Sequence, residues 1–206
     1  MIVRSFAPVA APDARGLILG SMPGVASLEA GEYYAHPRNA FWPIMGALFG
    51  AGPELPYPAR LQRLEAVGVA LWDVIAACER AGSLDSAITP ASIEANDFAR
   101  LFRDCPQIRH VFFNGAAAET AFRRHVRGRI ALPALSITRL PSTSPAHAAR
   151  KLEAKLAAWQ AVQVATRIDK DSEEGARRSA LHTPTAPALA AGHKTIVHPV
   201  AAAHAA

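Results

Sequence analysis

Residues 16–24, GLILGSMPG, carry the strongest indication of the architecture, because the apolar run 17–19 passes directly into a turn between Gly20 and Gly24. A short apolar run without polar alternation is typical of a strand buried on both faces of a sheet. Glycines around a proline let the backbone approach a ligand closely and leave amide donors exposed. The turn lacks the Gly-Lys-Ser/Thr of a phosphate-binding loop and the third glycine of a dinucleotide fingerprint, so nucleotide hydrolysis and nicotinamide chemistry lose support.

Similar apolar runs recur along the chain and are separated by amphipathic stretches. The further runs that predict strands are residues 69–72, 111–113 and 135–138. The stretches that predict helices are residues 40–49, 59–66, 93–102, 115–126 and 146–162. This alternation predicts an α/β fold with a mostly parallel sheet covered by helices on both sides. In such folds the sites gather at the carboxyl ends of the strands, so the loops after the four runs are the informative ones.

Composition restricts the class of protein further. The 206 residues are 50% hydrophobic and 19% charged, which is enough apolar material for one buried core. No run of about eighteen apolar residues occurs, so a membrane span or secretory signal is not expected. Cys78 and Cys105 have no partners at metal or cluster spacing, and a reducing, cytoplasmic setting is expected.

The last part of the chain differs from the rest in composition. No aromatic residue follows Trp159, and residues 166–206 are rich in Ala, Pro and His. We therefore predict a folded domain over residues 1–165 and a disordered tail over 166–206. The tail carries five basic and four acidic residues, so +4 of the formal charge of +5 belongs to the domain. The tail histidines admit a metal-binding interpretation, but irregular spacing favours solvated side chains; they are His182, His193, His198 and His204.

Chemistry-bearing side chains are densest in residues 33–42, YYAHPRNAFW. Tyr33 and Tyr34 offer flat aromatic faces for a base, and His36 and Arg38 offer contacts to phosphate. The following residues have both functional and structural interpretations. Asn39 is either a functional amide or the cap of the next helix, whereas Phe41 and Trp42 are expected in the core.

The loop at residues 140–147, LPSTSPAH, lies between the last predicted strand and the last predicted helix. Hydroxyls and backbone amides at a helix N-terminus favour an anion such as phosphate. A purely structural helix start would have the same residues, so both interpretations stay open here.

These pieces, in this order, resemble the uracil-DNA glycosylase superfamily, in which a G-x-x-P-G motif, an aromatic residue and a Ser/Pro loop follow strands of a parallel sheet. Residues 20–24, Tyr34 and residues 140–147 correspond to these three features. The segments YYAHPRNAFW, LWDVIAACERAGSLDS, VFFNG and LPSTSPAH are together most similar to the hypoxanthine-DNA glycosylase family, the sixth family of the superfamily. The resemblance covers about residues 15–160 and implies a three-layer α/β/α fold with a central four-stranded sheet.

One departure from the superfamily pattern concerns the residue that positions the attacking water. Relatives carry Asn or Asp where this chain has Met22, and methionine cannot do that work. The resemblance to the hypoxanthine family implies instead that the catalytic amide is Asn39. An amide is no strong base, so Asn39 is expected to orient a water and stabilise the cationic sugar.

The resemblance also implies roles for other residues. Tyr34 is expected to stack on the flipped base, and the Ser21 and Met22 amides to bind its edge. Asp73 either touches the base edge or braces a loop, and Asn114 is expected to tie loops together. The expected base-binding residues are Gly20, Ser21, Met22, Tyr34, Asp73 and Asn114. The expected DNA-binding residues are His36, Arg38, Ser142, Thr143, Ser144 and His147.

The function that follows is a monofunctional DNA glycosylase of base excision repair, chiefly releasing hypoxanthine and leaving an abasic site. No lysine lies in either motif, so no lyase step is expected, and neither a metal nor a cofactor is implied. The expected partner is damaged DNA, duplex with single strands left open, bound by a cytoplasmic, nucleoid-associated monomer without membrane contact. The alternatives are release of uracil, xanthine or mismatched bases, a non-catalytic DNA-binding module, and a metabolite-binding α/β protein unrelated to DNA.

Overall fold

A computed structural model of the chain describes residues 1–147 and 150–180, with side chains described up to Arg167. At its centre is a four-stranded sheet in the order β3-β2-β6-β7, in which every neighbouring pair is parallel. Its strands are β2 (Gly16–Gly20), β3 (Val69–Asp73), β6 (His110–Asn114) and β7 (Ser136–Leu140). The four predicted strands and the parallel sheet are therefore confirmed.

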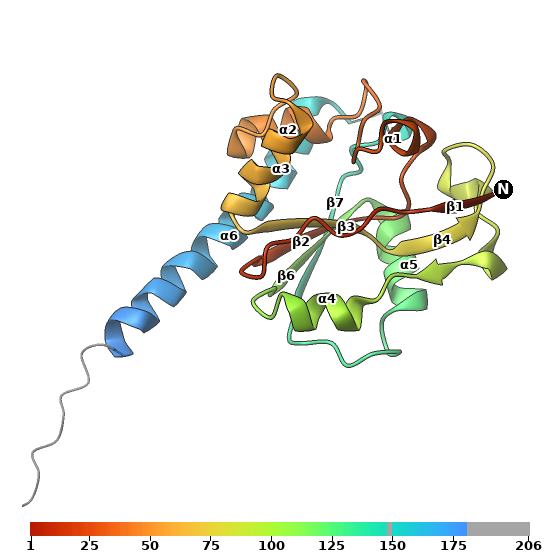
Figure 1. Cartoon of the computed structure of the whole chain (residues 1–206). Coiled ribbons are helices and arrows are strands. Elements are labelled where there is room, and N and C mark those ends of the chain that lie inside the picture. The colour runs from red at the N-terminus through yellow and green to blue at the C-terminus, as the bar shows by residue number, and fades with distance from the viewer. Residues whose placement is uncertain (148–149, 181–206) are drawn as a thin grey trace, which may run out of the picture.

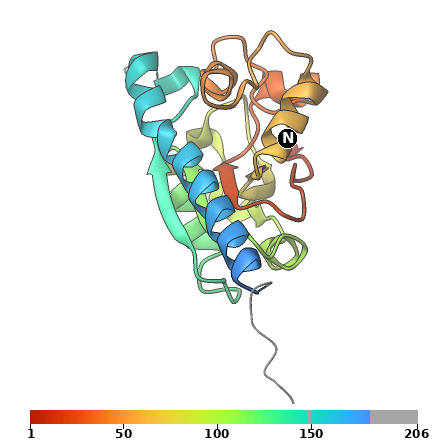
Figure 2. The ribbon, with the colours of Figure 1, turned by 90° about the vertical axis from the view of Figure 1, so that its left-hand side faces the viewer.

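Helices cover both faces of this sheet, which gives the predicted three layers (Figure 1). Successive side chains of a strand point to opposite faces, so Ile18 packs in one core while Leu17 and Leu19 pack in the other. The Ile18 face carries α2 (Phe41–Phe49), α3 (Tyr57–Ala66) and α6 (Leu152–Ala180). The opposite face carries α4 (Phe98–Asp104) and α5 (Ala116–His125). Figure 2 shows α6 lying along the outside of the sheet.

A second, antiparallel sheet in the order β1-β4-β5 was not predicted. Its strands are β1 (Ile2–Arg4), β4 (Ile75–Glu79) and β5 (Glu94–Ala95). Only Val74 separates β3 from β4, so the two strands merge into one apolar run in the sequence. The 3₁₀ turns η1 (Asp85–Ala87) and η2 (Pro90–Ser92) follow β4. The same fold brings this segment beside the first loop, where the Val25 N–H, at the start of α1 (Val25–Ala30), donates to Ser83 Oγ at 2.9 Å.

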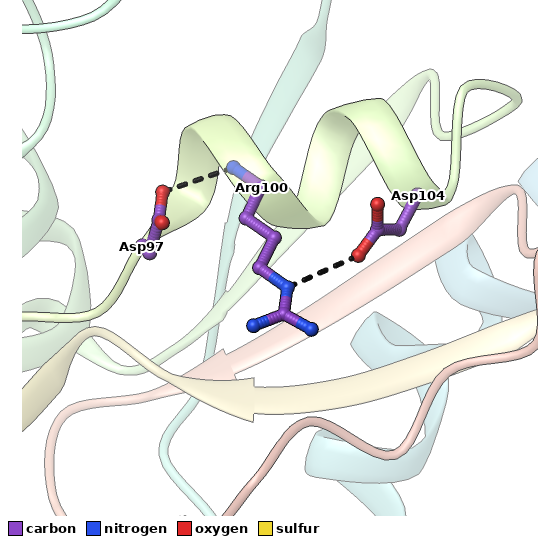
Figure 3. A network of polar contacts seen from close by, with 3 residues as sticks. All are labelled: Asp97, Arg100 and Asp104. Carbon is purple, nitrogen blue, oxygen red and sulfur yellow. Dashed lines mark hydrogen bonds and ion pairs between the residues drawn. The ribbon is translucent and has the colours of Figure 1, made fainter.

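The predicted helix over residues 93–102 is wrong at its start, because α4 begins at Phe98. Asp97 Oδ1 accepts a hydrogen bond from the Arg100 N–H at 2.9 Å, which caps the helix at that residue (Figure 3). Arg100 Nε then lies 3.4 Å from Asp104 Oδ2 along the exposed face of α4. The residues before Asp97 pair with β4 instead of extending the helix.

The last helix also differs from its predicted bounds. Residues 145–147 form the 3₁₀ turn η3 (Pro145–His147), and α6 runs from Leu152 through Ala180. The predicted domain end at residue 165 therefore falls inside a helix, and the backbone of 166–180 is helical where a disordered tail was predicted. Thr166 is buried, and its hydroxyl donates to the Val162 carbonyl at 3.2 Å. The rest of the predicted tail, 181–206 with its four histidines, lies outside the described residues.

Within the described part of the chain, no helix combines the length and hydrophobicity needed to cross a bilayer. Cys78 and Cys105 are both buried free thiols.

Candidate functional site

A cavity of about 150 Å³ lies where the parallel strands end. Gly20, Asp73 and Asn114 are the last residues of β2, β3 and β6, and all three line it. The loops after these strands supply most of the remaining predicted residues. Those that line the cavity are Ser21, Met22, Tyr34, His36, Asn39, Ser142, Thr143 and Ser144. Arg38 and His147 are exposed and do not line it.

Asp73 lies at the buried end of this cavity. Its side chain is only 3% exposed, and Oδ2 is buried with no hydrogen-bond partner among the described residues. The carboxyl lies across the backbone of Gly20, because a Cβ on Gly20 would be 2.4 Å from Asp73 Oδ1. Burial raises the pKa of Asp73 to about 8; the Asp85 carboxylate adds to the rise and Arg80 opposes it. The carboxyl is therefore mostly protonated at neutral pH.

Tyr34 is held in an unusual backbone conformation beside this carboxyl. Its φ of +57° makes it the one non-glycine residue with positive φ in the part of the chain described. The neighbouring residues are pinned on both sides. The Tyr33 N–H donates to the Tyr57 hydroxyl at 2.9 Å, and the Ala35 N–H donates to Ser27 Oγ at 3.2 Å. Such over-determined strain is typical of functional sites.

The Tyr34 ring stacks on Phe41, with centroids 3.9 Å apart and an interplanar angle of 22°. Its hydroxyl is buried without a hydrogen-bond partner in the described residues. Burial, and then the nearby Asp73, raise the pKa of this phenol, while the close Asn114 amide moderates the rise without hydrogen-bonding geometry. Phe41 and Trp42 are buried, as predicted.

The Asn39 side chain bonds to the backbone at the start of α2, as its interpretation as a helix cap predicted. Its Oδ1 accepts a hydrogen bond from the Phe41 N–H at 3.0 Å, although the cap position of α2 is Ala40. Asn39 also lines the cavity, so the two interpretations do not exclude each other. The bond to Phe41 fixes the amide and leaves Nδ2 and one Oδ1 lone pair for a ligand or water.

Thr143 connects three loops through its N–H, its carbonyl and its hydroxyl oxygen. Its N–H donates to Asn114 Oδ1 and its Oγ1 accepts from Asn114 Nδ2, both at 2.8 Å. Its carbonyl accepts from the Ala40 N–H at 3.0 Å, and the residue is only 1% exposed. Burial and these bonds make Thr143 a connector of the loops, and its predicted phosphate contact stays a prediction. Asn114 ties the same loops together.

The first loop, residues 20–24, is held by hydrogen bonds from residues that the sequence did not single out. The Val74 and Ile75 N–H groups donate to the carbonyls of Gly20 and Ser21 at 2.9 and 3.0 Å. The buried Arg80 guanidinium donates to the Pro23 carbonyl. These bonds direct the loop carbonyls away from the cavity. None of the hydrogen bonds among the described residues uses the N–H of Ser21 or Met22.

Asp85 and Ser83 also line the cavity, from the segment that follows β4. Ser21 Oγ donates to Asp85 Oδ1 at 2.7 Å, which joins this segment to the first loop. The sequence offered one signal for them, since the S-L-D-S segment belongs to the stretch that resembles the hypoxanthine family. Their role could not be read from spacing, because it depends on the unpredicted second sheet.

A basic groove of about 490 Å³ adjoins the cavity, and Ser142 lines both. The groove is lined by basic side chains that the sequence did not single out except for His147: Arg139, His147, Arg150 and Lys155. Arg139 forms an ion pair with Glu119, with 3.2 Å between Nη1 and Oε2. Lys155 is only 4% exposed, and burial lowers its pKa. A concave basic surface beside a cavity can hold a phosphodiester backbone.

Comparison with known proteins gives a consistent picture. Residues 7–163 match the family described as the uracil DNA glycosylase superfamily. The chain is 37% identical over 113 residues to the hypoxanthine DNA glycosylase of Methanosarcina barkeri, covering 54% of this chain and 70% of that protein. It is 38% identical over 119 residues to the hypoxanthine DNA glycosylase of Methanosarcina acetivorans, covering 57% and 74% respectively.

A solved structure is similar over most of its length. It is the solution NMR structure of a Methanosarcina acetivorans protein described provisionally as a uracil DNA glycosylase. The TM-score is 0.64 at 31% identity, and the alignment covers 82% of this chain and 99% of that one.

Proposed function

The chain belongs to the uracil-DNA glycosylase superfamily, and on that premise we propose that it releases hypoxanthine from deoxyinosine in DNA by hydrolysis, leaving an abasic site. The names of the two Methanosarcina relatives support the choice of base. The observation that carries the proposal is that Asn39, Asp73 and Tyr34 line one small cavity, in which Asp73 and Tyr34 each have a buried polar atom without a hydrogen-bond partner among the described residues. Buried polar groups without partners are rare in proteins, and two of them beside one cavity favour this place for a ligand.

Asn39 is the proposed catalytic amide. Its bond to the Phe41 N–H holds the side chain in one orientation. The free amide group then orients a water toward C1′ of the extruded nucleotide and stabilises the cationic sugar of the transition state. The C1′–N9 bond breaks and the water oxygen bonds to C1′. Since an amide cannot act as a strong base, much of the acceleration must come from departure of the base.

The walls of the cavity are the proposed base-binding surface. The free Ser21 and Met22 N–H groups are donors suited to O6 or N7 of hypoxanthine. The Met22 side chain packs in the core, so only its backbone is assigned to the base. Tyr34 stacks on the base with the ring face opposite Phe41.

The DNA backbone is proposed to cross the loops around the cavity and the adjoining basic groove. His36, Arg38, Ser142, Ser144 and His147 keep the roles that the sequence predicted for them. Arg139, Arg150 and Lys155 extend this surface along the groove. Contacts of this kind neutralise phosphates and release counterions, so binding should weaken steeply with salt.

The test is single-turnover release of base from duplexes that carry one hypoxanthine, uracil or xanthine, with Asn39→Ala compared with Asp97→Ala. Both variants lose a hydrogen bond at a helix start, but Asp97 caps α4 away from the cavity. We expect Asn39→Ala to lose hypoxanthine release by roughly 10²–10³-fold while keeping duplex affinity. Asp97→Ala should release hypoxanthine at the wild-type rate.

Other outcomes would redirect the proposal. Release of uracil or xanthine without hypoxanthine would keep the reaction and change the base. Salt-dependent duplex binding without release of any base would favour a DNA-binding module. Tight binding of free nucleotides without duplex binding would favour a metabolite-binding protein.

A further inference from the structure

Departure of a purine is assisted by a proton, which neither Asn39 nor the backbone N–H groups of the first loop can supply. When the C1′–N9 bond breaks, its electron pair moves into the base, and a proton on a ring nitrogen stabilises that charge. The Asn39 amide and backbone N–H groups donate hydrogen bonds but not protons. Of the two aspartates that line the cavity, Asp73 is buried and Asp85 is exposed, and Asp73 Oδ2 has no partner among the described residues.

We propose that Asp73 is the general acid of the reaction: its carboxyl donates a hydrogen bond to N7 of the extruded hypoxanthine and transfers the proton as the C1′–N9 bond breaks. This inference rests on the proposed function and adds to it the source of the leaving-group proton. The step balances without a further reagent. N7 gains the Asp73 proton, C1′ gains the water oxygen, the second water proton goes to solvent, and Asp73 takes a proton back from solvent after release.

The geometry supports this role because the carboxyl is held in place without forming an ion pair with a basic side chain. Asn96 Nδ2 donates to the Asp73 backbone carbonyl at 2.8 Å, which fixes the end of β3. Gly20 has no Cβ, and this absence leaves room for Oδ1 over β2. Arg80, the cation that lowers the pKa of Asp73, donates to the Pro23 carbonyl, and no ion pair of the described residues joins it to Asp73.

The balance of burial and charge around Asp73 favours its neutral form. Asp85 comes from η1, Tyr33 and Tyr34 from the turn before α2, and Arg80 directly follows β4. Asn114 and His36 line the same cavity. Burial and the Asp85 charge outweigh Arg80, so the pKa lies near 8 and the protonated form exceeds the ionised form by roughly tenfold at pH 7. A protonated carboxyl in a buried site can act as both donor and acid.

The experiment measures single-turnover release of hypoxanthine between about pH 5 and pH 10 for the wild type and for the isosteric Asp73→Asn variant. The wild-type rate should be level in acid and fall tenfold per pH unit above about pH 8. Asp73→Asn should be slower by roughly 10²–10⁴-fold and should lose this alkaline fall. Asp85→Asn should move the fall to lower pH, because Asp85 raises the pKa of Asp73.

A second substrate tests the acceptor atom. In a duplex with 7-deaza-2′-deoxyinosine, N7 is replaced by carbon, so the proton has nowhere to go. The wild type should release this base far more slowly than hypoxanthine. On this substrate Asp73→Asn should be no slower than the wild type. Circular dichroism and duplex affinity of Asp73→Asn establish that the variant is folded and binds DNA.

Two results would overturn the inference while leaving the proposed function intact. One is a fall of the rate at alkaline pH that persists in Asp73→Asn. The other is that Asp73→Asn slows the release of hypoxanthine and of its 7-deaza analogue by the same factor. A wild type that releases no hypoxanthine at any pH would instead refute the proposed function, and the general-acid role would be refuted with it.

Discussion

Two clusters of polar side chains in this protein are built in opposite ways. Along α4, from its cap Asp97 to its last residue Asp104, the side chains of Asp97, Arg100 and Asp104 are exposed and bonded to one another or to the helix backbone (Figure 3). At the end of β3, Asp73 and Tyr34 are buried and have no hydrogen-bond partner for Oδ2 and the hydroxyl among the described residues. The first arrangement contributes to stability, whereas the second costs stability. The difference favours the cluster at the end of β3, and not the one along α4, as the proposed binding site.

The largest effect expected from this difference is on the pH dependence of stability. In the folded protein the pKa of Asp73 is about 8, far above its usual value of 3.8. Between these two pKa values the folded state holds a proton that the unfolded chain has lost. The free energy of unfolding of the wild type therefore falls as the pH rises from about 4 to about 8. Asp73→Asn should be more stable than the wild type at about pH 9 by a few kcal/mol, and by much less near pH 4. Urea unfolding of both proteins at both pH values measures this difference in stability. An equal difference at the two pH values would show that folding does not raise the pKa of Asp73.

The second prediction concerns the glycine beneath the carboxyl. A Cβ on Gly20 would meet Asp73 Oδ1 at 2.4 Å, whereas a Cβ on Gly24 would meet nothing closer than 3.5 Å. Gly20→Ala should destabilise the protein by roughly 1–3 kcal/mol through overpacking and should slow base release with it. Gly24→Ala, in the same loop, is the matched control and should change both little. Equal effects of the two variants would mean that Asp73 does not need this space.

The third prediction compares two tyrosine hydroxyls. Tyr34→Phe removes a hydroxyl without a partner, so stability should stay equal or rise by up to about 1 kcal/mol, while hypoxanthine release falls by about tenfold or less. Tyr57→Phe removes the hydroxyl that accepts from the Tyr33 N–H at 2.9 Å. It should lower stability by about 1 kcal/mol. Thermal unfolding and single-turnover kinetics of both variants measure the contrast, which a destabilised Tyr34→Phe would contradict.

The smallest effects are expected at α4. Asp97→Ala removes the helix cap and should cost about 1 kcal/mol, whereas Asp104→Ala removes an exposed ion pair and should cost at most about 0.5 kcal/mol. Neither should change the rate of base release. Denaturant unfolding gives the costs, and a slowed reaction in either variant would mean that the α4 cluster affects the site.

Part of the site could be predicted because its residues follow apolar strands directly. Gly20, Asp73 and Asn114 end three of the predicted strands, and parallel strands end at one edge, so their proximity follows from local pattern alone. The same reasoning located Tyr34 and Asn39 near that edge. It did not reveal that Thr143 connects the loops, because a hydroxyl in a Ser/Pro loop has the same sequence whether it faces solvent or bonds to Asn114.

Other contributions to the site could not be predicted. Arg80, Ser83 and Asp85 reach the first loop through the antiparallel sheet, which merges with β3 in the sequence because only Val74 separates the two strands. The basic groove likewise combines Arg139 on β7 with Lys155 on α6, and no local pattern relates the two.

The sequence by itself determined the layered fold, the edge at which the site lies and the family, because hydrophobic periodicity and short motifs are properties of neighbouring residues. Only the tertiary structure decided that Asp73 Oδ2 and the Tyr34 hydroxyl are buried without partners among the described residues and that one guanidinium nitrogen of Arg80 donates to the Pro23 carbonyl. Burial and hydrogen bonding depend on segments far apart in the chain. The protonation state of Asp73 depends on both, so a chemical role for this carboxyl could be inferred only from the folded molecule.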